Sequence, residues 1–327
     1  MSNRGKLVQP LFDGPVDLIG DVHGEIDALR DILQHLGYDD VGRHPEGRRL
    51  VFLGDLVDRG PDSPGVVRLV MQFVEAGCAQ CVMGNHELNI MRARHGELDK
   101  LKPDNAWFFG ACDLAHEEKA AFDRFFASLP VALHREDLRA VHACWEPGMI
   151  ATAAEHDHAL ALYKEYARRI DQAILIEPEL RSDTIERSLA KQNRNPIKVL
   201  TSGLEIRTDE PWGLGDGKLR HEDRDPWFER YNDDAFVVFG HYWRIPAPGC
   251  GSAKDLFGEY ELHHSFGNGN AMCIDYSVGR RYLLDKHPDW PHRLRLGALR
   301  WPERELVFDD GERREIASQF AGQTKER

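Results

Sequence analysis

The stretch LVFLGDLVDRGPDS, residues 50–63, begins with four apolar residues and then places three acids and an arginine within eight positions. A short apolar run bounded by glycine is typical of a strand that is covered on both faces. In open α/β sheets, functional side chains gather just beyond the carboxyl ends of such strands. The stretch therefore predicts one wall of a functional site.

Five other apolar runs end in the same way, in polar residues that can bind a metal or a phosphate; they are residues 16–19, 79–83, 138–141, 235–239 and 271–274. Between the first of these runs the apolar residues recur at helical spacing. Residues 26–36 predict one helix that stops at Gly37, and Ser63 is the predicted N-cap of a second, with Pro64 at its first position. This β-α-β-α-β alternation by itself favours a single parallel sheet.

The remaining chain divides by composition. Residues 1–15 are expected to form an N-terminal tail, and residues 16–285 the main domain, with a charged helical insertion or cap at about 151–198. Residues 207–225 are rich in Gly, Asp and Arg and predict loops. Residues 286–327 are expected to add C-terminal strands, at 295–298 and 305–308, and a tail, packed on the same domain.

Composition excludes several classes of function. The 327 residues are 42% hydrophobic, which is enough for a substantial core, and no run approaches the roughly 20 apolar residues of a membrane span. With 42 basic and 55 acidic residues the net charge is −13, which argues against general nucleic-acid binding. Six irregularly spaced cysteines indicate a reducing compartment, so we expect a cytoplasmic protein that is not bound to a membrane. The oligomeric state stays open.

Side chains at the strand ends form a metal-ligand set of carboxylate, imidazole and amide groups: Asp21, His23, Asp55, Asn85, His142 and His241. Such groups suit borderline or hard divalent ions, with Mn first and Fe, Zn, Co or Ni as alternatives. Six ligands suit two ions better than one, since a carboxylate can bridge a metal pair. Any one of these residues alone could be a turn or a cap, but the ordered set predicts two divalent metal ions.

The same clusters carry a family resemblance. GDVHG at 20–24, GDLVDRG at 54–60 and GNHE at 84–87, followed by His142 and by Gly240-His241, resemble the signature of calcineurin-like metallophosphoesterases in the phosphoprotein phosphatase branch. The resemblance implies an α/β fold in which a β-sandwich of two mixed sheets, flanked by helices, replaces the single parallel sheet. It also implies that Asp21, His23 and Asp55 hold one metal, while Asp55 bridges to a second held by Asn85, His142 and His241.

Three further residues suit roles that metals do not fill. The resemblance places Arg59 on phosphate oxygens, which its planar fork fits. His86 directly follows a metal ligand and is the expected general acid, with Asp58 holding its proton. Arg220 and Arg224 precede the last metal-binding strand, and the sequence leaves open whether they clamp the substrate or are solvated loop residues.

The resemblance covers two kinds of relative. Symmetrical diadenosine tetraphosphatases are similar throughout, but Asp58 and Glu87 match the form found in protein phosphatases, and the segments around 200–227 and 299–303 resemble bacterial serine/threonine phosphatases. We therefore expect a phosphomonoesterase that works by direct attack of metal-bound hydroxide. The alternative is a dinucleoside polyphosphate hydrolase, and an inactive scaffold with the same fold is disfavoured because the ligand set is complete.

Overall fold

Two mixed sheets form the centre of the molecule in a computed structural model that describes residues 5–96, 114–213, 219–244, 256–257, 260–283 and 294–316. The first sheet has the strand order β1 (Val8–Pro10), β5 (Ala132–His134), β6 (Leu138–Val141), β9 (Phe236–Phe239), β10 (Ala271–Cys273). The second has the order β13 (Arg313–Glu315), β12 (Glu305–Phe308), β11 (Gly297–Trp301), β2 (Val16–Ile19), β3 (Arg49–Phe52), β4 (Ala79–Cys81). The predicted two-sheet α/β fold is confirmed, and the single parallel sheet suggested by the alternation alone is wrong.

Neighbouring residues of the central strands belong to different cores. Leu18, Val51 and Val238 pack between the two sheets, whereas Ile19 and Phe52 pack on the outer side, in the cluster that contains the helix residues. Because both faces of each central strand are buried, the strands read as continuous apolar runs. The sequence therefore located these strands but could not show that their two faces serve two cores.

The strands that carry the predicted site residues run in the same direction within each sheet. Strands β2, β3 and β4 are mutually parallel, and so are β6, β9 and β10. Their carboxyl ends meet at one edge of the sandwich, where Gly20 after β2 packs against the backbone of Ile274 after β10. Loops that are far apart in the chain are thus brought to one place.

In the described part of the chain, the strands of the second sheet are followed by α1 (Ile26–Leu36), α2 (Ser63–Glu75), α3 (Asn85–Arg94) and α5 (His116–Ser128). The predicted end of α1 is confirmed, since Gly37 caps it in the left-handed conformation. The N-cap of α2 is Asp62, whose carboxylate accepts a hydrogen bond from the backbone N–H of Gly65. Ser63, the predicted cap, is instead the first helical residue; its hydroxyl accepts from the backbone N–H of Asp58.

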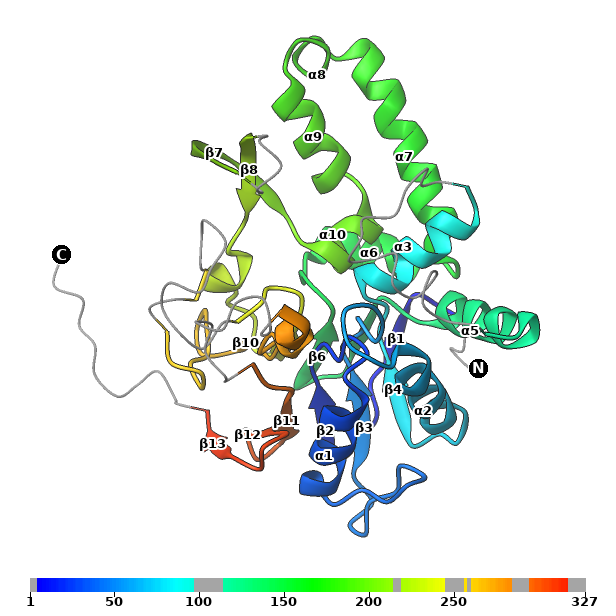
Figure 1. Ribbon diagram of the computed structural model, residues 1–327. Coiled ribbons are helices and arrows are strands. Elements are labelled where there is room, and N and C mark those ends of the chain that lie inside the picture. The colour runs from blue at the N-terminus through cyan, green and yellow to red at the C-terminus, as the bar shows by residue number, and fades with distance from the viewer. Residues whose placement is uncertain are drawn as a thin grey trace, which may run out of the picture.

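A helical segment occupies the region predicted as an insertion; its members are α6 (Pro147–Ala154), α7 (Ala159–Ile176), α8 (Pro178–Ser182), α9 (Thr184–Asn193) and α10 (Pro196–Ser202). Figure 1 shows α7 and α9 projecting from the sheets side by side, with the short α8 joining them at the far end. Within the described ranges, no helix combines the length and the apolarity that crossing a bilayer requires.

The segment 207–225, predicted as loops, contains a β-hairpin of β7 (Glu205–Gly213) and β8 (Leu219–Arg224), which packs beside α9 (Figure 1). Its strands show no apolar alternation because most of their side chains are at least partly exposed. Opposite charges instead face each other across the pair, as at Glu205 and Arg224. Two short 3₁₀ helices follow later, η2 (Trp227–Arg230) and η3 (Val278–Leu283).

Segments near both ends of the described chain join the sheets. Val8–Pro10, within the predicted N-terminal tail, forms the edge strand β1 and pairs in parallel with β5, which corrects that prediction. Near the C-terminus, β11 and β12 lie close to the predicted ranges, and β11 pairs antiparallel with β2. Such pairing between distant segments leaves no local mark in a three-residue strand, so the sequence did not reveal β1.

Glycines allow the site loops to approach one another. Gly54 has a φ of +88°, and a Cβ atom there would lie 2.4 Å from the backbone nitrogen of Gly84. A Cβ atom at Gly240 would lie 2.0 Å from Oδ1 of Asp21. Neither position has room for a side chain. The glycines of the sequence motifs therefore allow the site loops to pass close to one another.

Gly54→Ala should destabilise the protein more than Gly47→Ala does. Gly47 also has a positive φ, of +72°, but no heavy atom lies within 4 Å of its missing Cβ. We expect about 1 kcal/mol from the left-handed backbone alone at position 47, and about 1–3 kcal/mol in addition from the steric clash at position 54. Urea unfolding midpoints measure both; equal losses would contradict the close crossing.

Candidate active site

The backbone of the site is held in an unfavourable conformation. Among the described residues other than glycine, seven have a positive φ, and five of these belong to the site motifs: His23 (48°), Asp55 (47°), Asp58 (70°), Arg59 (70°) and His241 (67°). The left-handed region costs an L-residue about 1–2 kcal/mol. Such strain persists only where surrounding contacts fix the chain, and it is concentrated at functional sites.

Glu87 supplies those contacts for the loop after β3. Its Oε2 accepts hydrogen bonds from the backbone N–H groups of Asp55 and Gly84, both at 2.9 Å, and its Oε1 accepts from Leu56 at 2.8 Å. Burial, together with the charge of Asp55, raises the pKa of Glu87 to about 7, while the hydrogen bond from the backbone N–H of Leu56 lowers it. Sequence reasoning used Glu87 only to compare relatives, although an acid at the third position of a helix is a known capping signal.

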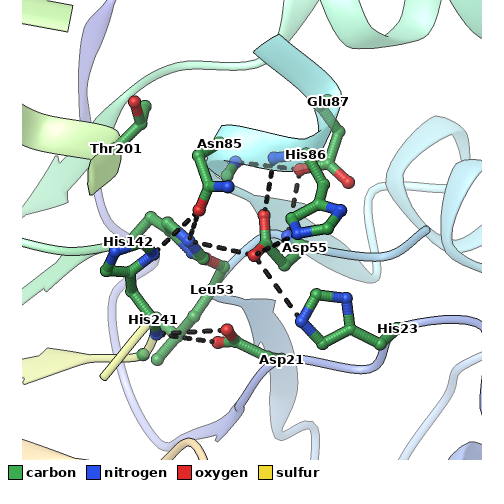
Figure 2. A network of polar contacts seen from close by, with 12 residues as sticks. Asp21, His23, Leu53, Asp55, Asn85, His86, Glu87, His142, Thr201 and His241 are labelled. Carbon is green, nitrogen blue, oxygen red and sulfur yellow. Dashed lines mark hydrogen bonds and ion pairs between the residues drawn. The ribbon is translucent and has the colours of Figure 1, made fainter. Parts of the chain in front are cut away.

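Hydrogen-bond acceptors converge on one point of the site (Figure 2). His142 donates its Nδ1–H to the carbonyl of Leu53 at 2.7 Å, which leaves the lone pair of Nε2 facing Oδ2 of Asp55 at 3.4 Å and Oδ1 of Asn85 at 3.2 Å. Nδ1 of His241 lies 2.8 Å from the same Asn85 oxygen. Acceptors in such proximity repel one another unless a positive charge lies among them, so the donor set fits a cation.

His23 extends this arrangement on the other side of Asp55. Its Nδ1 donates to the carbonyl of Val57 at 3.0 Å, and its Nε2 lies 3.7 Å from Oδ2 of Asp55. Within the described residues, two groups have ligand atoms all within 4.8 Å of one another: His23, Asp55 and His86, and Asp55, His142 and His241. Asp55 is common to both, which is the geometry that a bridging carboxylate needs.

The charges of Asp55 and His142 depend on each other. Burial opposes ionisation of Asp55, but the imidazoles of His142 and His86 hold its pKa well below the usual range. Burial likewise opposes the charge on His142, but Asp55 and then Asp21 raise its pKa to about 10. The buried carboxylates are therefore stabilised by a nearby positive charge. Either a proton on His142 or a metal ion that replaces this proton can supply it.

Asp21 lies at the edge of the cluster (Figure 2) and outside both groups of close ligand atoms. Its carboxylate accepts from the backbone N–H of His241 at 3.1 Å. Burial, and next the neighbouring Asp275, raise the pKa of Asp21 well above its usual range. Asp275 is 1% exposed, and sequence reasoning noted it as a strand end without assigning it to the site.

His86 is held by Asp58, the residue that the sequence paired with it. Oδ2 of the fully buried Asp58 accepts from Nδ1 of His86 at 2.7 Å. On the other side of the ring, Nε2 lies 3.9 Å from Oδ2 of Asp55 and 3.3 Å from Nη2 of Arg59. The imidazole thus turns one nitrogen to a buried carboxylate and the other to the centre of the site.

Arginines gather around Trp243 at the rim of the site. The guanidinium carbon lies 4.7 Å from the indole centroid for Arg59, 5.8 Å for Arg224 and 4.4 Å for Arg280. Arg224 also donates to the backbone carbonyl of His241 at 3.4 Å. Neither Trp243 nor Arg280 was singled out from the sequence, where an isolated aromatic and a pair of arginines carry no recognisable motif.

The two arginines that the sequence left undecided have different surroundings. Arg224 reaches the rim of the site, where burial, and to a lesser degree Arg59, lower its pKa. Arg220, four residues earlier on β8, forms an ion pair with Glu205 at 3.2 Å. The structure therefore brings Arg224, and not Arg220, next to the strand end that carries His241.

Comparisons with known proteins agree with this geometry. The sequence profile of the calcineurin-like phosphoesterase family matches residues 14–243. The chain belongs to this family. As a calcineurin-like phosphoesterase it is an enzyme of a class that uses divalent metals, and its mixed sheets with flanking helices are those of the family fold.

Curated relatives of this phosphoesterase include the asymmetrical bis(5'-nucleosyl)-tetraphosphatase of Anoxybacillus flavithermus, which is 45% identical over 233 residues, or 69% of this chain and 77% of the relative. The protein of the same name from Oceanobacillus iheyensis is 25% identical over 236 residues, or 69% and 76%. The crystal structure of a cold-active protein-tyrosine phosphatase from a psychrophilic Shewanella has a TM-score of 0.50 at 18% identity, covering 94% and 82% of the two chains, and shows a shared fold.

Glu87→Gln should destabilise the enzyme by about 2–3 kcal/mol, because an amide has one acceptor oxygen and would turn its NH₂ group toward a backbone N–H. The matched control is Glu118→Gln on α5, where a surface pair with Arg68 is replaced; we expect a loss below about 1 kcal/mol there. Urea unfolding of the two variants measures the difference. Similar losses in both would show that Glu87 does not hold the loop.

Proposed function

We propose that this phosphoesterase hydrolyses dinucleoside polyphosphates of the tetraphosphate class. The observation that carries the proposal is the group of guanidinium ions around Trp243, directly beside His23 and His86. In a chain of net charge −13, a local concentration of positive charge is needed to attract a substrate with several phosphates. The tetraphosphatase names of the relatives support the same substrate class.

The converging acceptors support two divalent metal ions. We assign Asp21, His23 and Asp55 to the first ion, and Asp55, Asn85, His142 and His241 to the second. Mn²⁺ is the first candidate for this nitrogen and oxygen donor set, with Fe, Zn, Co or Ni as alternatives. Metal ions at this position would polarise the phosphoryl group and acidify a water molecule for direct attack on phosphorus.

The remaining residues act on the substrate itself. Arg59 and Arg224 present guanidinium groups from two different loops, which suits them to bind phosphoryl oxygens and orient the reacting group. Asp58 fixes the ring of His86 so that its Nε2 faces the site, where a proton on that atom can pass to the leaving oxygen. Asp58 is therefore a positioning residue, and His86 the acid.

One observation favours a second candidate, the hydrolysis of phosphomonoesters such as phosphorylated proteins. The buried pair of His86 and Asp58 suits a leaving group that needs a proton, as an alcohol does. A nucleotide leaves as a stable anion and depends less on such help. The pair is compatible with both reactions, whereas several arginines exceed what a single phosphate requires.

A substrate panel tests the assignment. With Mn²⁺, we expect kcat/KM for diadenosine tetraphosphate to exceed that for a phosphoserine peptide by more than about 100-fold. Contacts along the polyphosphate chain are expected to stabilise the transition state as well as the bound substrate. Steady-state kinetics with p-nitrophenyl phosphate as a common reference gives the ratio. A preference for the phosphopeptide would replace the main proposal with the second candidate.

Arg224→Ala should raise KM for diadenosine tetraphosphate by about tenfold or more, which corresponds to the loss of one charge-assisted contact of about 1.4 kcal/mol. Arg220→Ala is the matched control on the same strand, and we expect a change of less than about twofold because Arg220 pairs with Glu205. Circular dichroism of both variants checks the fold. A larger effect at Arg220 than at Arg224 would contradict the assignment.

Asp55→Asn should remove activity and bound metal together, because the amide lacks the charge that lets one side chain serve two ions. Elemental analysis after dialysis against Mn²⁺ measures the metal content. The exposed Asp31→Asn on α1 is the control and should retain two equivalents. Two undiminished equivalents in the Asp55 variant would rule out the bridging role.

A further inference from the structure

Arg280 lies at the active site without belonging to any of the family motifs. It sits on η3, which begins three residues after Asp275, the residue that follows β10. Its guanidinium carbon is 4.4 Å from the centroid of the half-buried Trp243, closer than that of Arg59 at 4.7 Å. Arg280 and Arg59 therefore contact the same indole, and Arg59 also contacts the site directly.

The backbone around Arg280 is pressed against a proposed metal ligand. A Cβ atom at Gly279 would lie 2.5 Å from Cδ2 of His23, so η3 packs on the edge of that imidazole. Arg280 therefore directly follows a residue that contacts the site. A cation over an indole gains about 0.5–2 kcal/mol, which is enough to favour one direction for the guanidinium.

The neighbouring Arg281 has a different role. Its Nε donates to the carbonyl of Leu294 at 2.8 Å, and its Nη2 to Oδ2 of Asp309 at 2.5 Å. The two consecutive arginines thus diverge, one toward Asp309 and the other toward Trp243. Arg281 is a structural contact, whereas Arg280 adds positive charge to a rim that already holds Arg59 and Arg224.

Three guanidinium ions around one indole repel one another, and this arrangement is favourable when anionic groups lie among them. Arg59 donates hydrogen bonds to Nε2 of His23 and Nε2 of His86, so it lies at the proposed metal centre, where we assign it to the phosphate being cleaved. Arg280 lies against the same indole from η3, one residue after the glycine that packs on His23. A phosphate chain, unlike a single phosphate, would reach both.

We propose that Arg280, held against Trp243, forms a second anion subsite beside the metal centre, which binds a phosphoryl group adjacent to the one being cleaved. The inference rests on the proposed function, since it names how the site distinguishes a polyphosphate from a phosphomonoester. A planar guanidinium fixed by an aromatic ring binds phosphate oxygens with little loss of side-chain entropy. The subsite selects for chain length and takes no part in bond cleavage.

The test compares Arg280→Ala with Arg281→Ala at a fixed free Mn²⁺ concentration. Two ratios are measured in each preparation: kcat/KM for diadenosine tetraphosphate relative to p-nitrophenyl phosphate, and the inhibition constant of inorganic tripolyphosphate relative to that of orthophosphate. In Arg280→Ala we expect both ratios to move against the polyphosphate by about tenfold, the equivalent of 1.4 kcal/mol. In Arg281→Ala we expect both ratios to stay within about twofold of the wild type.

Ratios taken within one preparation do not depend on the folded fraction, so a partial folding defect leaves the comparison valid. If the wild type fails to hydrolyse diadenosine tetraphosphate, the proposed function is wrong, but the inhibition ratio still tests the subsite. An equal change in the inhibition constants of tripolyphosphate and orthophosphate in Arg280→Ala would overturn the inference. The same selectivity loss in Arg281→Ala would overturn it as well.

Discussion

Three backbone N–H groups bound by the carboxylate of Glu87 are the constraint on which the rest of the site depends. These hydrogen bonds hold the backbone of Asp55 in the left-handed region, which is an unfavourable conformation. In this conformation the carboxylate of Asp55 points toward the centre of the site. The N–H of His86 in turn donates to Oδ1 of Asp55 at 2.9 Å. The first turn of α3 and the loop after β3 are therefore one hydrogen-bonded unit, and residues on both take their positions from it.

Charge is the second organising factor. Buried acceptors from both sheets face one another around Asp55, and they require positive charge, either from a proton on His142 or from a bound cation. The rim has the opposite character, because Arg59, Arg224 and Arg280 gather on Trp243. Negative ligands at the floor suit metal ions, and positive side chains at the rim suit phosphates. This separation lets an acidic protein hold an anionic substrate close to its metals.

The rim comes from segments outside the sandwich core. Arg224 stands at the end of the β7–β8 hairpin, which packs against α9 of the projecting helical segment, and Arg280 stands on η3. The hairpin contributes few buried positions to the sheets, so it can vary without disturbing the floor of the site, whereas η3 packs on His23 through Gly279. The floor carries the motifs of the phosphoesterase family, and the proposed substrate contacts lie at the rim.

The sequence by itself determined the central strands, the helices α1 and α2, and the family, because strands buried on both faces and glycine-anchored polar loops leave strong local patterns. It also supplied every candidate ligand, since each lies within four residues of the end of a strand. Only the tertiary structure decided what distant segments do together. It placed Val8–Pro10 in a sheet, formed a hairpin from a segment without apolar alternation, separated Arg224 from Arg220, and assembled Arg280 with Trp243. Such pairings depend on packing between residues far apart in the chain, and no local pattern records them.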